Sequence, residues 1–223
     1  MKSGRPFVTL TYAQSLDGSI AAKPGTPLAL SSPESLAFTH ELRASHDAIL
    51  VGIGTILADN PQLNVRYAQG PNPRPVILDS MLRCPTNARF LDAVRRPIIV
   101  ATKHAPMDRQ HELESVGAFV WRLPSTQDVQ ACIDLHTLLG QLDVEGIKTL
   151  MVEGGAHIIT SFLQAQLVDR FVVTIAPMIV GGVRSVAELV SNEVTRLPRL
   201  QNATMRPLGC DWVVSGELNW GNK

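Results

Sequence analysis

The sequence lacks most of the features that mark secreted, metal-binding or nucleic-acid-binding proteins. It has three cysteines and no C-x-x-C pair, so we expect neither a disulfide framework nor a zinc site. The six histidines show no H-x-x-x-H or comparable ligand spacing, and we therefore predict no metal. Twenty basic and twenty acidic residues give a formal net charge of zero, which argues against a general binder of nucleic acids or anionic membranes.

Long apolar segments are also missing. No stretch reaches the length of a transmembrane helix, and the first six residues lead into a strand-like run without the apolar centre of a signal peptide. We therefore expect a soluble, cytoplasmic protein without a membrane partner. What the sequence does contain is a hydrophobic fraction of 45% over 223 residues, so we expect one globular domain over residues 1–223.

Short apolar runs alternate with helical patterns along the chain. Strands are predicted over residues 7–13, 47–51, 74–78, 97–101, 118–121 and 149–152. Helices are predicted from a Ser32 cap followed by Pro33, over residues 129–142, and over residues 156–167. This alternation predicts an α/β fold with a mostly parallel central sheet flanked by helices. Residues 171–175 and 212–218 predict a C-terminal antiparallel pair, and residues 63–75 a surface loop.

The segment VGIGTILADNP at residues 51–61 joins an apolar run to a glycine turn whose backbone N–H groups can face a phosphate. Thr55 and Asp59 follow four residues apart, which places both side chains on one face of a helical turn. As a dinucleotide fingerprint the segment is weak, because the third glycine of G-x-G-x-x-G is missing. Two alternatives stay open here: a simple strand exit, and a turn-forming role for Asp59 ahead of Asn60-Pro61.

A second glycine turn, Glu153-Gly154-Gly155, directly follows the predicted strand at residues 149–152. Ligands bind at the carboxyl ends of parallel strands, and glycines there let a ligand approach the backbone. The alternative is a tight turn with an exposed glutamate. The position of the turn at the carboxyl end of a predicted parallel strand favours a ligand-binding role over this alternative. Two such junctions indicate a site divided between a nucleotide and a substrate.

Other candidates are less specific. Arg43 and Arg66 carry guanidinium groups that match phosphate geometry, although a solvated surface arginine is the commoner case. Gly181-Gly182 predicts either a loop over the site or a hairpin connection. We interpret His157 as a helix-start residue and not as a general base.

Several segments taken together resemble one family. They are RPFVTL at residues 5–10, AQSLDG at 13–18, LR at 42–43, VGIGTILADNP at 51–61, VEGG at 152–155, LVD at 167–169 and IAP at 175–177. Their order resembles the riboflavin-biosynthesis pyrimidine reductases, which share the dihydrofolate-reductase-like fold, and the wording is closest to the stand-alone fungal-type members. The resemblance extends from Arg5 to the last predicted strand.

The resemblance implies an NADPH-dependent oxidoreductase of riboflavin biosynthesis. Its reaction would reduce the ribosylamino side chain of 2,5-diamino-6-ribosylamino-4(3H)-pyrimidinone 5′-phosphate to the ribitylamino form. The ring-opened ribosylamine is an imine that accepts hydride, so the cofactor carries the hard step and the protein positions the partners. The sequence lacks the H-x-E and P-C-x-x-C signatures of the zinc deaminase fused to the bacterial relative, which favours this substrate over its deaminated alternative. A homodimer through the late strands is implied as well.

By matched positions, the resemblance assigns cofactor contacts to Ala13, Thr55, Asp59, Gly154, Gly155, Ala156, His157 and Ile158, and substrate contacts to Arg43, Leu63, Arg66 and Glu153. We expect Arg43 and Arg66 to hold the ribose phosphate while Glu153 orients the sugar or imine. Lys103, after the fourth predicted strand, is a weaker candidate for the phosphate that separates NADPH from NADH. Pro27 and Ala29 replace a serine and a tryptophan of the bacterial relative, so no contact is carried over from residues 23–30.

Two rival functions remain at this stage. A dihydrofolate-type reductase needs an acidic residue in an early helix to hold the pterin ring, and Glu34 or Glu41 would supply it. The Glu153-Gly154-Gly155 turn and the Leu16-Asp17-Gly18 segment speak against that rival. The second rival is a nucleotide-binding protein that keeps the fold without hydride transfer.

Overall fold

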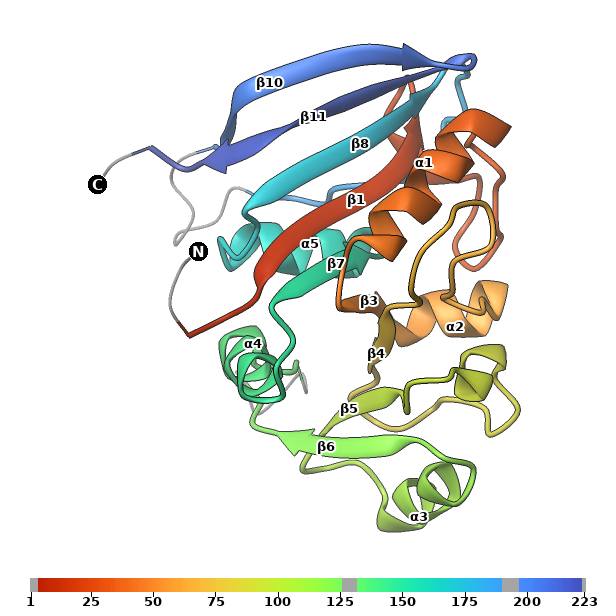
Figure 1. Ribbon diagram of the computed structural model, residues 1–223, viewed down its shortest axis with the longest axis vertical. Coiled ribbons are helices and arrows are strands. Elements are labelled where there is room, and N and C mark those ends of the chain that lie inside the picture. The colour runs from red at the N-terminus through yellow and green to blue at the C-terminus, as the bar shows by residue number, and fades with distance from the viewer. Residues whose placement is uncertain (1–3, 126–131, 190–196, 222–223) are drawn as a thin grey trace.

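The computed structural model describes residues 4–125, 132–189 and 197–221. In this part of the chain, nine strands form one sheet in the order β10-β11-β8-β1-β7-β3-β4-β5-β6, and a separate pair joins β2 to β9 (Figure 1). The strands are β1 (Phe7–Ser15), β2 (Ser19–Ala21), β3 (Ala48–Gly52), β4 (Arg74–Leu78), β5 (Ile98–Thr102), β6 (Phe119–Leu123), β7 (Thr149–Glu153), β8 (Arg170–Ala176), β9 (Val183–Arg184), β10 (Arg199–Leu208) and β11 (Asp211–Asn219).

Across the sheet, the neighbouring strands in the run β8-β1-β7-β3-β4-β5-β6 are parallel to one another. The strands β11 and β10 complete the sheet on the β8 side, and both pair in antiparallel fashion. Because parallel strands end at the same edge, the segments that follow β1, β7, β3 and β4 meet at one side of the sheet. The α/β fold with a mostly parallel sheet and a C-terminal antiparallel pair is thereby confirmed.

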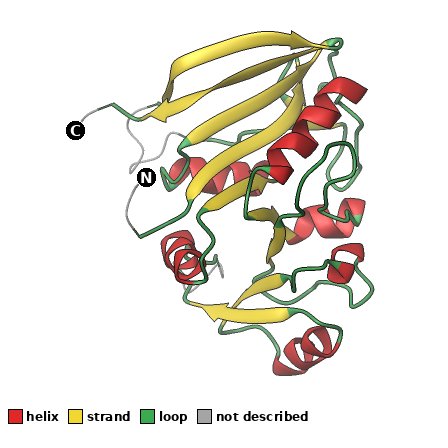
Figure 2. Ribbon diagram, viewed as in Figure 1, coloured by secondary structure: helices red, strands yellow, loops and turns green. Residues whose placement is uncertain are grey.

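Helices cover both faces of the sheet (Figure 2). The helices are α1 (Pro33–Ala44), α2 (Ile53–Asp59), α3 (Met107–Ser115), α4 (Leu135–Val144) and α5 (Ala156–Gln164), with a short 3-10 helix η1 (Arg89–Asp92). Alternate residues of β3 belong to the hydrophobic clusters on opposite faces of the sheet. Leu50 packs in the cluster with α4 and α5, whereas Ile49 and Val51 pack in the cluster with α2 and α3. This explains the continuous apolar runs of the central strands, since both faces are buried. No helix among the described residues is long and apolar enough to cross a bilayer.

The first helix begins where its capping residues predict. Ser32 accepts a hydrogen bond from the Ser35 backbone N–H, and Pro33 occupies the first turn. The buried carboxylate of Asp211 accepts hydrogen bonds from the Ser32 backbone N–H at 2.7 Å and from the Ser35 hydroxyl. These bonds fasten the start of α1 to the β10–β11 hairpin.

Several boundaries differ from the sequence predictions. The helix predicted over residues 129–142 begins at Leu135, because Asp134 caps it through the backbone N–H groups of His136 and Thr137. Ile133 instead forms a bridge with Ser125, and Val129 lies outside the described residues. The helix predicted to reach residue 167 ends at Gln164, because Gln166 has a φ of 55° and reverses the chain.

Several elements have no counterpart in the predictions, among them β2, β9, β10, α3 and η1. The antiparallel pairing of residues 171–175 with 212–218 is confirmed, but β11 has a second partner, β10, whose residues are almost all exposed. The polar helix α3 was also not predicted, since it buries one residue fully, Leu113. The predicted surface loop over residues 63–75 begins with a buried side chain, because Leu63 is only 2% exposed.

Candidate functional site

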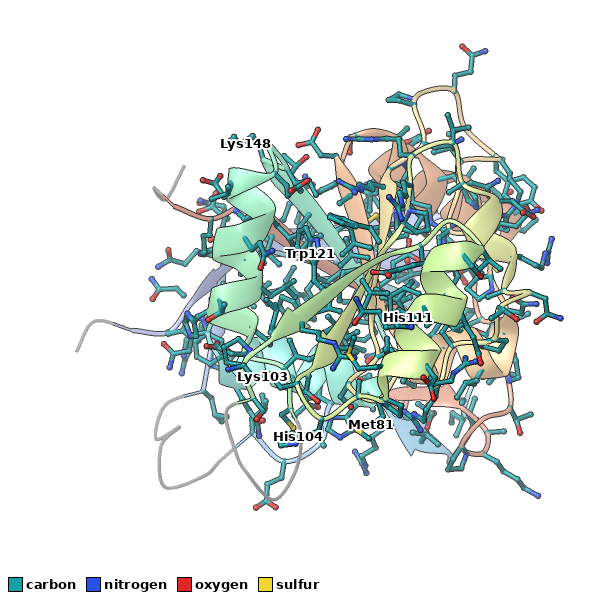
Figure 3. The ribbon with its side chains drawn as sticks, turned by 90° about the horizontal axis from the view of Figure 1, so that it is seen from below. Met81, Lys103, His104, His111, Trp121 and Lys148 are labelled. Carbon is teal, nitrogen blue, oxygen red and sulfur yellow. The ribbon has the colours of Figure 1, made fainter. Side chains whose placement is uncertain are left out.

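A cavity of about 1160 Å³ opens at the carboxyl ends of β1, β7, β3 and β4. In Figure 3, Met81 and Lys103, which follow β4 and β5, are labelled in the lower part of the view, and Lys148, which precedes β7, is labelled at the top, so the carboxyl ends of the strands point downward there. The cavity is lined by eleven of the twelve candidate residues, namely Ala13, Arg43, Thr55, Asp59, Leu63, Glu153, Gly154, Gly155, Ala156, His157 and Ile158. The exception is Arg66.

The two glycine turns are adjacent, because β3 and β7 pair directly. A Cβ atom on Gly52 would lie 2.8 Å from Ile158 Cγ1, and one on Gly154 would lie 2.6 Å from Ile158 Cβ. Real Cβ atoms do not approach so closely, so both positions require glycine for α5 to pack against the sheet. The alternative of a simple strand exit for Gly52 therefore holds in part, since this glycine has a packing role as well as a place in the cavity wall.

The start of α5 can bind an anion. Its cap residue is Gly155, which has no side chain to satisfy the first backbone N–H groups of the helix. Gly155, Ala156 and His157 all line the cavity, so the positive end of the helix dipole faces the open space. The uncapped N–H groups can donate hydrogen bonds to the diphosphate of a dinucleotide, and the glycines before the helix let that group come close to the backbone. His157 is exposed in the first turn of α5, as expected for a helix-start residue.

Thr55 and Asp59 lie one helical turn apart on α2, and both face the cavity. The turn before Pro61 is made by Asn60, which adopts a left-handed conformation with a φ of 41°. Asp59 is therefore not needed to form that turn. Desolvation raises the pKa of the Asp59 carboxyl, because burial disfavours the charged form.

Arg43 and Glu153 form a fork-to-fork ion pair between α1 and the end of β7. Arg43 Nε lies 2.8 Å from Glu153 Oε1, and Arg43 Nη2 lies 2.6 Å from Glu153 Oε2. The third nitrogen, Nη1, donates to the Asn64 carbonyl at 3.1 Å. Burial works to lower the pKa of the guanidinium, but the charge and hydrogen bonds of Glu153 keep it above its ordinary value. Most of the donors of Arg43 are thus engaged within the protein.

Sequence reasoning missed His40, which lies behind this pair. The ring is fully buried, and its Nδ1 accepts a hydrogen bond from the Arg66 backbone N–H at 2.9 Å, which places the ring proton on Nε2. Nε2 lies 3.5 Å from Arg43 Nη1, and the ring packs edge-on against Tyr67. Its spacing of three residues from Arg43 on a helix was the available signal. The Arg66 side chain is exposed and donates to Asn64 Oδ1 at 2.5 Å.

The loop over residues 20–31 forms another wall of the cavity, and Pro27 and Ala29 belong to it. Its base is fixed by Asp17, which accepts hydrogen bonds from the Ser15 and Ser19 hydroxyls and from the backbone N–H groups of Val180 and Gly181. The Ser15 bond is the largest of the effects that hold the pKa of Asp17 well below its ordinary value. Gly181-Gly182 is therefore a loop secured beside β2 and not a hairpin connection.

Ser80 and Arg83 are among the cavity residues that were not predicted. They follow β4, and the signal that could have found them is their place after a parallel strand. Among the described lining residues, neither Lys103 nor the acidic pair Glu34 and Glu41 is present. Within the described chain, no group of three or more His, Cys, Asp or Glu side chains could hold a metal ion.

Comparison with known proteins identifies close relatives. A family model described as the RibD C-terminal domain matches residues 6–214. The 2,5-diamino-6-ribosylamino-4(3H)-pyrimidinone 5′-phosphate reductase of Methanothermobacter thermautotrophicus is 43% identical over 217 residues, which cover 94% of this chain and 97% of that protein. The protein of the same name from Debaryomyces hansenii is 41% identical over 195 residues, covering 80% and 78%.

Solved structures agree with the sequence comparisons. The riboflavin biosynthesis reductase Rib7 of Saccharomyces cerevisiae superposes with a TM-score of 0.76 at 31% identity, covering 98% of this chain and 92% of that one. Acinetobacter baumannii RibD gives a TM-score of 0.81 at 25% identity, and this chain spans 59% of its length. Dihydrofolate reductase from Enterococcus faecalis, at 14% identity and a TM-score of 0.52, shares the fold alone.

Proposed function

Because this chain belongs to the family of the RibD C-terminal domain, we propose that it uses NADPH to reduce 2,5-diamino-6-ribosylamino-4(3H)-pyrimidinone 5′-phosphate to its ribitylamino form. The observation that carries the proposal is that one cavity contains both the Arg43–Glu153 pair and the uncapped start of α5. A charged pair suits a polar sugar substrate, and a helix start suits a cofactor diphosphate. We propose that the whole chain acts as one cytoplasmic domain.

The residues fit a nicotinamide dinucleotide. The backbone N–H groups of Gly155, Ala156 and His157 would hold the diphosphate, and Thr55 and Asp59 would contact the cofactor from the neighbouring strand exit. Ala13, at the end of β1, leaves room for the nicotinamide beside Glu153. When bound, NADPH supplies the hydride. The protein contributes the position of the substrate and the exclusion of water, so no covalent nucleophile is required.

Glu153 orients the ribosylamine, and the two hydrogen bonds from Arg43 hold this carboxylate in place. Because the donors of Arg43 are already engaged, the exposed guanidinium of Arg66 is the better of the two arginines for the ribose 5′-phosphate. Leu63 is buried and lines the cavity. Changing Arg66 to Ala is expected to raise the KM for the pyrimidine phosphate, and an unchanged KM would reject its phosphate role.

The direct test follows the absorbance of reduced nicotinamide with three substrates side by side. We expect NADPH oxidation with the diaminated pyrimidine phosphate, weaker oxidation with the deaminated one, and none with dihydrofolate. Preference for the deaminated compound would assign the bacterial-type substrate. Cofactor binding without oxidation of NADPH by any of the three would support the non-catalytic alternative. The absence of Glu34 and Glu41 from the described cavity wall argues against dihydrofolate.

We also propose a homodimer formed through the C-terminal strands. β10 is the edge strand of the sheet, and Met205 on β10 and Trp212 on β11 are 61% and 42% exposed. Large apolar side chains on an edge hairpin are typical of a surface that another subunit covers. Light scattering coupled to size-exclusion chromatography is expected to give twice the chain mass, and a monomer at micromolar concentration would reject the dimer.

A further inference from the structure

We propose that Asp211 is a positioning residue for the pyrimidine phosphate, because it fixes the start of α1, and this helix forms part of the cavity wall. The inference rests on the proposed function. Asp211 begins β11, and neither it nor its partners Ser32 and Ser35 are among the described residues that line the cavity. Asp211 therefore acts on the substrate through α1 and not by direct contact.

One face of α1 forms part of the cavity wall. Leu36, Thr39 and Arg43 line the cavity, and their spacing of three and four residues places them on one side of the helix. Arg43 also holds Glu153 through two hydrogen bonds. A tilt or a rotation of α1 would therefore move three lining residues and disturb the carboxylate that orients the ribosylamine.

Polar contacts hold α1 in place more than apolar packing does. Of the four buried residues of α1, which are Ser35, His40, Leu42 and Arg43, only Leu42 is apolar. In α5, by contrast, three of the four buried residues are apolar. Apolar burial is not directional, whereas a hydrogen bond fixes both a distance and an angle. The position of α1 therefore depends on its hydrogen bonds.

Asp211 supplies the acceptor for two of these bonds. The residue is 1% exposed, and its Oδ2 accepts from the Ser32 backbone N–H at 2.7 Å and from the Ser35 hydroxyl. Burial works to raise the pKa of Asp211, but the hydrogen bonds from Ser35 and Ser32 outweigh it and hold the pKa below its ordinary value. Because the acceptor is ionised, these bonds are stronger than bonds between neutral groups.

The turn of the hairpin lies against the start of α1 (Figure 1). Ser32 Oγ donates to the Leu208 carbonyl at 3.3 Å, and a Cβ atom on Gly209 would lie 2.9 Å from the same oxygen. On the next turns of the helix, the Arg206 guanidinium lies 4.8 Å from the centre of the Phe38 ring. The hairpin and the first turns of α1 thus form one unit, in which a single buried carboxylate supplies the charge.

The other end of α1 is attached to β1. His46 Nδ1 donates to the Leu42 carbonyl at 2.6 Å, and His46 Nε2 accepts from the Thr9 hydroxyl at 2.9 Å. If the bonds to Asp211 are lost, this attachment remains, and the start of the helix, about 12 Å from Arg43, becomes the end that moves. Most of the proposed cofactor residues lie on α2 and at the start of α5, so we expect substrate binding to weaken and NADPH binding to stay unchanged.

The test compares steady-state kinetics of the wild type with variants of this attachment. Ser35→Ala removes one hydrogen bond to the carboxylate, and Asp211→Ala removes both. We expect the KM for the pyrimidine phosphate to rise about 3-fold and about 10-fold respectively, with the KM for NADPH unchanged. The double variant should match Asp211→Ala, because Ser35 acts through that carboxylate.

A purely structural role would give a different result. A variant that only loses stability contains less folded enzyme, which lowers the apparent kcat but leaves both KM values unchanged. Asp169→Asn is the matched control, since this largely buried carboxylate binds Arg5 and the Val8 backbone N–H at the start of β1. It is expected to leave both KM values unchanged. If Asp211→Ala does not accumulate as folded protein, Ser35→Ala decides the question.

Hydrogen–deuterium exchange gives a readout that does not depend on turnover. We expect the backbone amides of α1 to exchange about tenfold faster in Asp211→Ala than in the wild type, while those of α5 keep their rate. Equal acceleration in α1 and α5, or an unchanged KM for the pyrimidine phosphate in both variants, would overturn the inference and leave the reductase proposal intact. A wild type that oxidises NADPH with neither pyrimidine phosphate would instead reject the proposed function.

Discussion

Arg43 and Glu153 lie at the centre of the site, and their side chains are 11% and 18% exposed. Removing one charge of such a pair leaves the other buried without its partner. Glu153→Gln is therefore expected to lower the free energy of unfolding by about 2–4 kcal/mol and to raise the KM for the pyrimidine phosphate, since the carboxylate that orients the ribosylamine is lost. Urea unfolding and steady-state kinetics on the folded variant measure the two effects.

A matched control exists at the opposite end of β1. Arg5 and Asp169 form a similar pair, with side chains 13% and 11% exposed, away from the cavity. Asp169→Asn should reduce stability by a comparable amount and leave the substrate KM unchanged. If both variants raised the KM equally, the effect of Glu153→Gln would be one of stability alone.

The lowered pKa of His40 makes the free energy of unfolding depend on pH. Burial first, and then the charges of Arg43 and Arg66, lower its pKa to about 4, against an opposing effect of Glu153. The unfolded chain, with a pKa near 6.5, binds the proton more readily, so stability is complete above pH 6.5 and falls as the pH drops toward 4. We expect a loss of about 1–3 kcal/mol between pH 7 and 4, measured by urea unfolding.

A substitution isolates this residue from other groups that titrate in the same range. The pKa of His46 is also lowered by burial, and it contributes a loss of the same sign. His40→Asn keeps an oxygen that can accept from the Arg66 backbone N–H but cannot take up the proton. Its stability should fall less steeply between pH 6.5 and 4 than that of the wild type. An unchanged slope would assign the pH dependence to His46 or another group.

At the scale of elements, the packing of α5 against the sheet depends on Gly154. An added methyl group would lie 2.6 Å from Ile158 Cβ, so Gly154→Ala must displace the start of α5. We expect a loss of about 1–3 kcal/mol in stability and a higher KM for the cofactor. Gly155→Ala is the matched comparison for stability, because its methyl group would meet no atom within 4 Å. Equal destabilisation by both changes would contradict this packing argument.

Element prediction succeeded where apolar runs and caps were strong, as in β4 and at the start of α1. It failed where the pattern depended on contacts distant in sequence. The apolar residues before α4 continue a helical spacing, but Asp134 caps the helix and Ile133 pairs with Ser125. The strand β10 buries almost nothing of its own and is defined by its hydrogen bonds to β11, which no local pattern reveals.

At the scale of the whole molecule, the cavity takes its walls from segments between residues 11 and 183, so a bound cofactor connects much of the fold. A ligand present at one hundred times its Kd stabilises the native state by about 2.7 kcal/mol. For a chain of this size that raises the Tm by roughly 5–10 °C. Differential scanning fluorimetry with NADPH is expected to show this rise, and Gly154→Ala should reduce it. A Tm unaffected by NADPH at high concentration would argue against a cofactor site in this cavity.

Strand composition and helix caps, which are local properties of the chain, were enough to predict the fold class. The order of the motifs carried the resemblance to the family, and the resemblance supplied the eleven residues that line the cavity. The tertiary structure alone decided which charges meet. Arg43 pairs with a glutamate 110 positions away, His40 is buried against the Arg66 backbone, and Arg83 enters the wall while Lys103 does not. Strand order and side-chain burial set these distances, and both depend on how the whole sheet assembles.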